Sequence, residues 1–558
     1  MKMRLLAALF ASLIGLAAQA RDHAPMAIGL STVADWSTQA PFLDHMKSAR
    51  PWIGHVAGQW GGSDHAALAA GGHLDSDGWP LRIPRELGSI GTLILTDLPS
   101  EATAFEGRYL LRFEGNGIVE VTGRAANVRY GRNRVAFDFT PGDGPVEIRI
   151  QRTDRARQND HVRNITVVRE DQVDAFDQGA VFNPEWLSRL EPFGAMRFMD
   201  WMDTNNSQQE TWADRPKPQD YTWARTGVPA EILVELANEA DVDAWFNMPH
   251  RADDAYIRAF AALVRDALEP GRTAYVEYSN EVWNWQFEQT RWADAQANAL
   301  WQAKDAGMQF YGMRAAQVAQ IWSDVFGAEA DTRLVNVISS QTGWPGLEEL
   351  AFTAPLWVDQ PKAPVAYFDA YAITGYFGGI LGTDERAPMV RGWIEDSRQA
   401  AAARATAEGL EGADRQAFLD RHAFDQAFGL AGAELMNGEV TGNVSDTVSD
   451  LIATTWPYHA KVAAAQDLDL IMYEGGTHVV GLGALVDDPA LTPFFTAFNY
   501  SAEMGALYQR LLDGWDEIGG QMFTAYVDVY APTKWGSWGG LRHLEDRNPR
   551  WDALVGAE

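Results

Sequence analysis

Two glutamates, each at the end of a strand-like run, have the side chains and the setting for acid–base or nucleophilic chemistry. Glu281 closes the stretch 274–281 together with Asn280, and Glu474 closes the stretch 468–474. A carboxylic acid can protonate a leaving group, and a second carboxylate can attack or stabilise an electron-poor carbon. This pairing requires a fold that brings the two strand ends to one place.

Strand-like runs alternate with amphipathic helical stretches after residue 175, which is typical of repeated βα units around a parallel sheet. Seven strands are predicted there, at 195–201, 243–248, 274–278, 334–339, 368–374, 468–473 and 520–526. Because seven strands do not close a (β/α)8 barrel, an eighth is needed, and the run 26–30 supplies it. The predicted fold class is therefore α/β, a (β/α)8 TIM barrel.

A different pattern follows the run 26–30. Between about 85 and 172, short β-branched and aromatic runs alternate with turns rich in glycine and aspartate, which predicts a small antiparallel β-sandwich. We favour an insertion, in which 21–80 forms the first barrel strand with its loop and 175–558 the remainder of the barrel. The alternative is a separate N-terminal domain over 21–172, with the first barrel strand elsewhere. The Ala-, Arg- and Glu-rich segment 382–437 predicts a helical insertion after the sixth strand.

The N-terminus has the pattern of a signal peptide over 1–20. Lys2 and Arg4 precede the apolar run 5–18, and Ala18-Gln19-Ala20 precedes Arg21. The apolar run is shorter than the roughly 20 residues that a membrane-spanning helix needs. We expect a periplasmic or secreted protein with no membrane span.

Composition excludes several function classes. The chain has 76 acidic against 45 basic residues and a formal charge of −31, so its surface repels phosphate backbones, and we expect no nucleic-acid partner. It has no cysteine, which excludes disulfides, iron–sulfur clusters and thiolate zinc sites. Nucleophile-elbow, P-loop and dinucleotide fingerprints are absent from the sequence, as are His-x-His and His-Glu-x-x-His. We expect neither a metal nor a cofactor.

In a (β/α)8 barrel, polar residues at the carboxyl ends of the strands build the active site, and the fourth strand faces the seventh. An Asn-Glu pair ending the fourth strand, with a glutamate ending the seventh, resembles clan A of the glycoside hydrolases, which are retaining barrel enzymes. The segments 246–250 and 371–376 are also similar to that clan. The stretch 29–38, with Arg50-Pro51-Trp52, resembles exported bacterial proteins labelled cellulose-binding or hypothetical.

The resemblance implies roles for individual residues. Glu281 would be the acid/base and Glu474 the nucleophile, with the pKa of Glu281 raised and Glu474 kept ionised. Asn280 would bond the sugar 2-hydroxyl, and Tyr376 would bond the nucleophile. Arg197 could orient the nucleophile, or it could pair with Asp200 instead.

Other polar residues have two interpretations. Glu277 has the same strand parity as Glu281 but lies about 13 Å deeper, so we expect it in a polar layer or a salt bridge. His250, after Pro249, is either a substrate-binding group or an ordinary loop residue.

Tryptophan is abundant, with 22 residues, and several lie at or beyond predicted strand ends. Indole rings provide faces on which sugar rings stack, although we expect about half of these side chains to pack in the core. The candidates for substrate contact are Trp36, Trp283, Trp535 and Trp538.

These patterns together predict an exported retaining β-glycoside hydrolase that acts on a neutral poly- or oligosaccharide. Two alternatives remain open at this point, a polysaccharide-binding protein without turnover and a transglycosylase that uses the same glutamates. The β-sandwich either binds carbohydrate or braces the barrel.

Overall fold

The computed structural model describes residues 25–556 and contains a closed barrel of eight parallel strands. The strands follow one another around the barrel in chain order: β1 (Met26–Gly29), β11 (Ala195–Arg197), β12 (Asp243–Met248), β13 (Ala274–Tyr278), β14 (Leu334–Ser339), β15 (Ala370–Phe377), β16 (Asp469–Thr477) and β17 (Phe523–Ala525). The (β/α)8 barrel predicted from the sequence is confirmed. The predicted leader at 1–20 lies outside the described residues.

The barrel strands are near-continuous apolar runs because both faces of a parallel barrel are buried. In β15 and β16, for example, nearly every residue is buried. Strand β1 lies between β17 and β11, with Ala27 beside Thr524 on one side and beside Ala195 on the other. The chain therefore leaves the barrel after its first strand and returns to it at the second.

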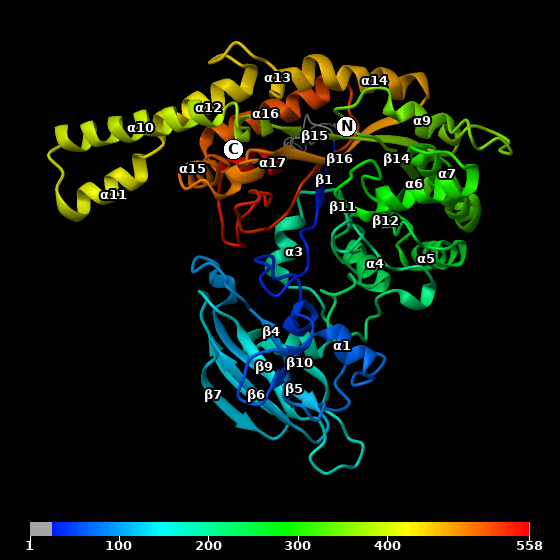
Figure 1. Ribbon diagram of the computed structural model, residues 1–558, viewed down its shortest axis with the longest axis vertical. Helices are drawn as coiled ribbons and strands as arrows, with labels where there is room; N and C mark the ends of the chain where they lie inside the picture. Colours follow the sequence, from blue (N-terminus) through cyan, green and yellow to red (C-terminus); the bar gives the residue numbers. More distant parts are fainter. Residues whose placement is uncertain (1–24, 557–558) are drawn as a thin grey trace, which may run out of the picture.

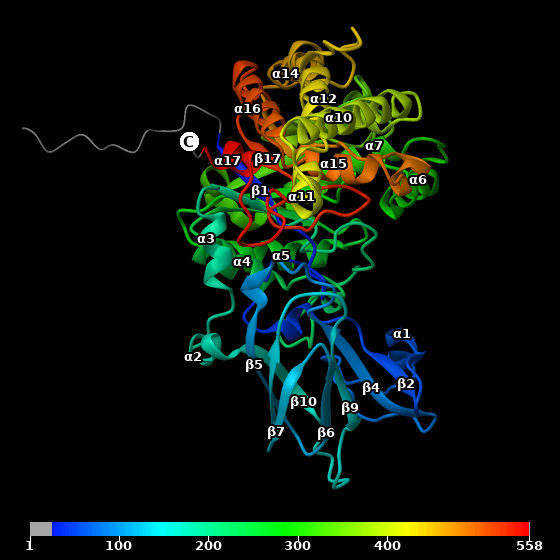
Figure 2. The same cartoon turned by 90° about the vertical axis from the view of Figure 1, so that its left-hand side faces the viewer.

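Two antiparallel sheets occupy the chain between β1 and β11 and form the small β-sandwich. One has the order β10-β5-β8-β7 and the other β3-β2-β4-β9-β6. Their strands are β2 (Ile53–Val56), β3 (Gly62–Ser63), β4 (Leu87–Ile94), β5 (Gly107–Glu114), β6 (Ile118–Gly123), β7 (Ala126–Gly131), β8 (Arg134–Phe139), β9 (Val146–Arg152) and β10 (Arg163–Arg169). Figures 1 and 2 show this sandwich as a separate body below the barrel.

The sandwich begins earlier than the predicted residue 85, because β2 and β3 join its five-stranded sheet. The sequence of β2, Ile-Gly-His-Val, lacks the apolar alternation that identifies a strand. Its glycine has a packing reason, since a Cβ atom at Gly54 would lie within 2.4 Å of a Leu87 methyl carbon. A close approach of this kind leaves no periodic signal in the sequence.

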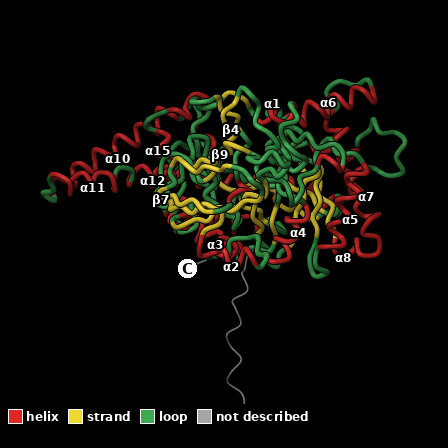
Figure 3. Tube along the Cα trace, turned by 90° about the horizontal axis from the view of Figure 1, so that it is seen from below, coloured by secondary structure: helices red, strands yellow, loops and turns green. Residues whose placement is uncertain are grey.

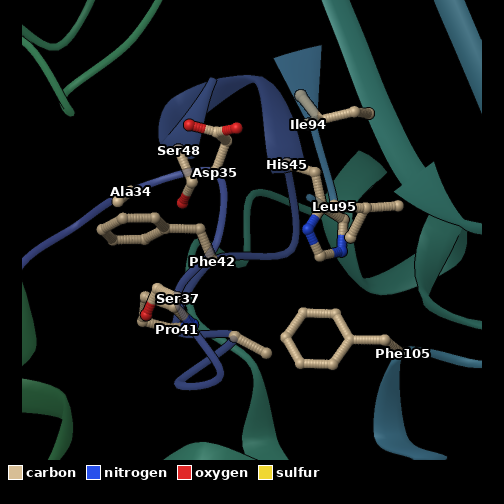
Figure 4. Close-up of a pocket in the computed structure, with 11 residues that line it drawn as sticks. Ala34, Asp35, Ser37, Pro41, Phe42, His45, Ser48, Ile94, Leu95 and Phe105 are labelled. Atoms are coloured by element: carbon tan, nitrogen blue, oxygen red, sulfur yellow. The ribbon is translucent and has the colours of Figure 1, made fainter. Parts of the chain in front are cut away.

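The loop after β1 joins the barrel to the sandwich. Asp44 caps the short 3₁₀ helix η1 (His45–Ser48) and also accepts a hydrogen bond at 2.8 Å from the backbone N–H of Val167 in β10. Figure 4 shows a small pocket at this seam, where the ring of His45 lies near Phe105. Burial lowers the pKa of His45 to about 4, so its imidazole is neutral at pH 7.

Helices surround the barrel, and their apolar stripes face it. In α5, the residues at 256, 257, 260, 261 and 264 are buried, which is the spacing of one helical face. The α-helices are α1 (His65–Ala70), α2 (Val173–Asp177), α3 (Pro184–Leu190), α4 (Ala230–Glu239), α5 (Asp254–Ala267), α6 (Glu288–Trp301), α7 (Gly307–Phe326), α8 (Ala330–Arg333), α9 (Leu347–Thr353), α10 (Ala387–Ala407), α11 (Gly412–His422), α12 (Asp425–Asn437), α13 (Val448–Asp450), α14 (Trp456–Ala465), α15 (Leu491–Phe498), α16 (Ala502–Glu517) and α17 (Pro549–Val555). Within residues 25–556, no helix has both the length and the apolar character needed to cross a bilayer.

Three of these helices, α10 to α12, occupy the segment 382–437 after the sixth barrel strand. Helices α10 and α11 form a hairpin that projects from the body of the molecule, as Figures 1 and 3 show. None of the residues of α11 is buried. The excursion lengthens one side of the molecule without contributing a strand to the barrel.

Candidate active site

Glu281 and Glu474 meet at the carboxyl ends of the barrel strands. Glu281 follows β13, the fourth strand of the barrel, and Glu474 lies in β16, the seventh. The hydroxyl of Tyr473, the residue before Glu474, donates a hydrogen bond to Glu281 Oε1 at 2.9 Å. The two predicted carboxylates therefore belong to one connected site.

Arg197, at the end of the second barrel strand, is the centre of this site and is almost fully buried. Its Nη1 donates to Glu474 Oε1 at 2.8 Å, and its Nη2 donates to Glu277 Oε2 and to Asn280 Oδ1, both at 2.9 Å. The ion pairs of Arg197 are with Glu277 and Glu474 rather than with Asp200. Of the two predicted partners of Arg197, Glu474 and Asp200, the structure shows an ion pair with Glu474.

Glu277 lies below the site, where its carboxylate accepts hydrogen bonds from a layer of buried polar side chains. This agrees with the expectation that it belongs to a polar layer or a salt bridge. Besides Arg197, its carboxylate accepts hydrogen bonds from Asn247 Nδ2 at 2.7 Å, Trp245 Nε1 at 3.1 Å and Ser339 Oγ at 2.6 Å. A buried carboxylate needs this many donors because its desolvation is costly. The layer fixes the guanidinium that in turn holds Glu474.

The second oxygen of Glu474 also has a donor. Tyr376 Oη, from the sixth strand, donates to Glu474 Oε2 at 2.9 Å. With Arg197 on Oε1, both oxygens of Glu474 are held and the plane of the carboxylate is fixed. This is the contact expected of Tyr376.

A β-bulge explains why Tyr473 and Glu474 both reach the site. Across β15 and β16, Ile373 pairs with Met472 but Thr374 pairs with Glu474, so Tyr473 is an extra residue. In a regular strand, consecutive side chains point to opposite faces, whereas a bulge re-aims one of them. The ring of Tyr473 lies 5.2 Å from the guanidinium of Arg197, beneath the site.

The chain bends sharply where the fourth strand ends. Ser279 and Glu281 have φ angles of 64° and 40°, a left-handed backbone that residues other than glycine adopt at a cost of about 1–3 kcal/mol. Asn280, between them, is buried, while Glu281 is half-buried. Asn284 Nδ2 donates to Glu281 Oε2 at 2.8 Å, and with Tyr473 it holds both oxygens of this carboxylate.

Burial raises the pKa of Glu474 to about 8, and the nearby charge of Glu281 acts in the same direction. Arg197 and the hydrogen bond from Tyr376 oppose the shift. The raised pKa corrects the expectation that the surroundings of Glu474 keep it ionised. One guanidinium shared with Glu277 does not neutralise two buried carboxylates.

His250 lies beside the site rather than in this network. Its ring packs edge-on against Trp292 at 5.4 Å, and its backbone oxygen accepts from Tyr278 Oη at 2.7 Å. Burial lowers the pKa of His250 to about 4, so the imidazole is neutral. Its Nδ1 has no hydrogen-bond partner among residues 25–556.

The four tryptophans take different places. Trp538 is half-buried and lies beside Tyr376 at 6.2 Å and Tyr526 at 5.9 Å, so it forms one wall of the site. Trp283 is buried against Tyr473 at 6.3 Å. Trp36 and Trp535 are 47% and 62% exposed on the loops after β1 and β17, toward the rim.

Sequence reasoning missed two residues of the site, Tyr473 and Tyr526, and named Asp200 only as a possible partner of Arg197. Tyr526 Oη donates to Asp200 Oδ2 at 3.2 Å, beside Trp538. Tyr526 comes directly after the eighth strand, so its position at a strand end was a usable signal. Tyr473 was hidden because strand parity points it away from the face of Glu474.

The part of the chain that the structure describes contains no group of three or more His, Asp or Glu side chains arranged to hold a metal ion. The polar groups of the site are carboxylates, one guanidinium, amides and phenols. This donor set suits proton transfer and carbohydrate hydroxyls.

Neither a protein-family model nor a curated protein sequence matches the chain. Among solved structures, it is similar to a fungal β-1,4-galactanase (10% identity, 67% of this chain and 91% of that one, TM-score 0.35). It is also similar to an exo-β-1,4-mannosidase from Opitutaceae bacterium strain TAV5 (10%, 70% and 56%, 0.34). A third is a xyloglucan-specific endo-β-1,4-glucanase from a metagenomic library (11%, 67% and 88%, 0.32). These likenesses are distant, and the barrel assignment rests on the strand pairing itself.

Proposed function

We propose that this protein is an exported, retaining β-glycoside hydrolase of a neutral poly- or oligosaccharide. Glu474 is the nucleophile and Glu281 the acid/base. The observation that carries the proposal is the double hold on Glu474, by Arg197 at 2.8 Å and Tyr376 at 2.9 Å, in a site that also contains Glu281. A nucleophile that must attack one carbon atom benefits from a fixed orientation.

The chemistry follows from the two carboxyl groups. Glu474 attacks the anomeric carbon while the bond to the glycosidic oxygen breaks, and Glu281 gives its proton to that oxygen. Glu281, now a carboxylate, removes a proton from water, whose oxygen attacks the same carbon and releases Glu474. Two displacements retain the configuration, and they require the carboxyl groups to be about 5–5.5 Å apart.

Charge favours a neutral substrate. The described site combines the carboxyl groups of Glu277, Glu281, Glu474 and Asp200 with one guanidinium, from Arg197. Such a site stabilises the positive charge that develops on the sugar ring in the transition state. It also repels uronates, and the formal charge of −31 acts in the same direction.

The direct test is hydrolysis. The wild-type protein is incubated with a panel of β-linked glucans, mannans, galactans and xylans and with aryl β-glycosides, and reducing sugar is measured. Glu474→Gln and Glu281→Gln should lose hydrolysis of the natural glycans by about 10²-fold or more while keeping the wild-type fold by circular dichroism. Binding without hydrolysis by the wild type would instead support a carbohydrate-binding protein, and unchanged hydrolysis by either variant would refute the assignment.

Export is proposed from the leader pattern at 1–20. When the full chain is expressed in a Gram-negative host, the mature N-terminus should be Arg21 and the protein should be recovered outside the cytoplasm. Mass spectrometry of the N-terminal peptide in each cell fraction measures both the cleavage site and the compartment. An uncut chain confined to the cytoplasm would contradict the proposal.

A further inference from the structure

Gln289 is a buried amide in the first turn of α6, and its side chain makes three hydrogen bonds that lead toward the site. Its Oε1 accepts from the backbone N–H of Asn206 at 3.0 Å. Its Nε2 donates to Asn205 Oδ1 at 2.7 Å and to the backbone oxygen of Asn280 at 2.8 Å. The side chain of Gln289 is fully buried, so it binds three chain segments together where water does not compete.

Asn205 connects Gln289 to the side chain of Asn280. Asn205 Oδ1 accepts from Gln289 Nε2 and also, at 3.1 Å, from Asn280 Nδ2. On its other side, Asn280 Oδ1 accepts from Arg197 Nη2 at 2.9 Å. Because a guanidinium only donates, this contact fixes which end of the Asn280 amide is oxygen.

The amide of Asn280 is therefore held at both ends, and one N–H of its Nδ2 remains for a ligand. A carboxamide nitrogen has two hydrogens, and among residues 25–556 Asn205 accepts one of them. The second hydrogen on Asn280 Nδ2 is the one that would bond the sugar 2-hydroxyl. Hydrogen bonds to that hydroxyl strengthen in the transition state of glycoside cleavage.

We propose that Gln289 and Asn205 are positioning residues that aim the Nδ2 N–H of Asn280 at the 2-hydroxyl of the sugar being cleaved. This inference rests on the proposed glycosidase function. The two residues touch Asn280 and not the reacting atoms, so they act on rate through the contact of Asn280 with the sugar. Their contribution is made in the transition state, and its loss lowers kcat with little effect on KM.

The loop that carries Asn205 offers a matched control. Asn206 Oδ1 accepts from the backbone N–H of Glu288 at 2.7 Å and anchors the same loop to α6. Asn206→Ala removes this anchor but leaves the side chains of Asn205, Gln289 and Asn280 in place. A general loosening of the loop should therefore show in Asn206→Ala as strongly as in Asn205→Ala.

A conservative replacement separates hydrogen bonding from packing. Both neighbours of Asn205 Oδ1 are donors, so Asn205→Asp keeps an acceptor for each of them, while Asn205→Ala keeps none. Gln289→Leu removes the donors at the other end of the connection. Melting temperature and circular dichroism establish that each variant is folded before its kinetics are compared.

The test compares an aryl β-glycoside that the wild type hydrolyses with its 2-deoxy analogue. In Asn205→Ala and Gln289→Leu, kcat for the parent glycoside should fall by about 10- to 100-fold, while kcat for the 2-deoxy analogue stays near its wild-type value. Asn205→Asp and Asn206→Ala should keep the wild-type ratio between the two substrates.

Equal losses on both substrates would overturn the inference and assign Gln289 and Asn205 a structural role, as would unchanged kinetics in a folded Asn205→Ala. If Gln289→Leu does not fold, Asn205→Ala decides alone, because Asn205 is only half-buried. If the wild type cleaves no glycoside at all, the proposed function itself fails. That result differs from failure of the inference alone, in which the wild type is active but the variants lose the same activity on the parent glycoside and on its 2-deoxy analogue.

Discussion

Tyr473 and Glu474 are consecutive residues of one strand, yet their polar atoms hold the two halves of one site. Tyr473 Oη donates to Glu281 at 2.9 Å, while Glu474 accepts from Arg197 at 2.8 Å. The bulge at Tyr473 makes this possible, because strand parity would otherwise send the two side chains to opposite faces. A single extra residue thus couples the proposed acid/base to the proposed nucleophile.

This coupling predicts that Tyr473→Phe acts through leaving-group protonation. The variant loses the donor to Glu281 but keeps the ring that lies against Arg197. We expect kcat/KM to fall about 10-fold for glycosides with poor leaving groups and to change little for dinitrophenyl glycosides, which leave without a proton. A Brønsted series of aryl glycosides measures this dependence. Equal losses across the series would show that the Tyr473 hydroxyl does not act through Glu281.

The pKa of Glu474 predicts the acidic limb of the pH profile. The nucleophile must be ionised, and its pKa is raised to about 8, so kcat/KM for a dinitrophenyl glycoside, which leaves without a proton from Glu281, should rise with pH until about pH 8. Tyr376→Phe removes a hydrogen bond that lowers this pKa, so the limb should move up by roughly one pH unit. Asp200→Asn removes a charge that raises it, so the limb should move to lower pH. Shifts in the same direction for both variants would contradict this electrostatic description.

Glu277 should matter more for stability than Glu281, the proposed acid/base. Its carboxylate is buried and pairs with Arg197, and breaking a buried ion pair costs about 3–5 kcal/mol. Glu277→Gln should lower the free energy of unfolding by about that amount in urea titrations. Glu281→Gln, at a half-buried position, is the matched control and should change it by less than about 1 kcal/mol. Equal stabilities of the two variants would mean that the buried layer does not support the fold.

Substitutions of Trp538 and Trp535 should depend differently on the length of the substrate. Trp538 contacts Tyr376 within the site, whereas Trp535 is exposed on the rim. Trp538→Ala should weaken kcat/KM about 10- to 100-fold for substrates of every length, since a buried aromatic contact contributes about 1.5–3 kcal/mol. Trp535→Ala should weaken only the longer oligosaccharides. Kinetics on a series from disaccharide to hexasaccharide test both, and a length-independent loss in Trp535→Ala would be contrary to its place on the rim.

The sequence predicted the barrel because its strands are separate apolar runs, and 243–248, 274–278 and 334–339 agree with the structure residue for residue. It placed Glu281 and Glu474 at the carboxyl ends of the fourth and seventh barrel strands for the same reason. It could not predict the hydrogen bonds of Gln289 or the bulge at Tyr473, which depend on register and on contacts between distant segments. The upward shift of the Glu474 pKa could not be predicted either, because it depends on burial and neighbouring charges, which the spacing of residues in the sequence does not reveal.

The central claim is that Glu474 forms a covalent bond to the sugar, and trapping that bond tests it most directly. A dinitrophenyl 2-deoxy-2-fluoro-β-glycoside of the sugar that the wild type hydrolyses should react and accumulate, because fluorine at C2 disfavours the oxocarbenium-like transition state. Intact-mass spectrometry should show one added fluoro-sugar, and peptide mapping should locate it on Glu474. A label on any other residue, or an active wild type that never becomes labelled and releases sugar of inverted configuration, would contradict the account.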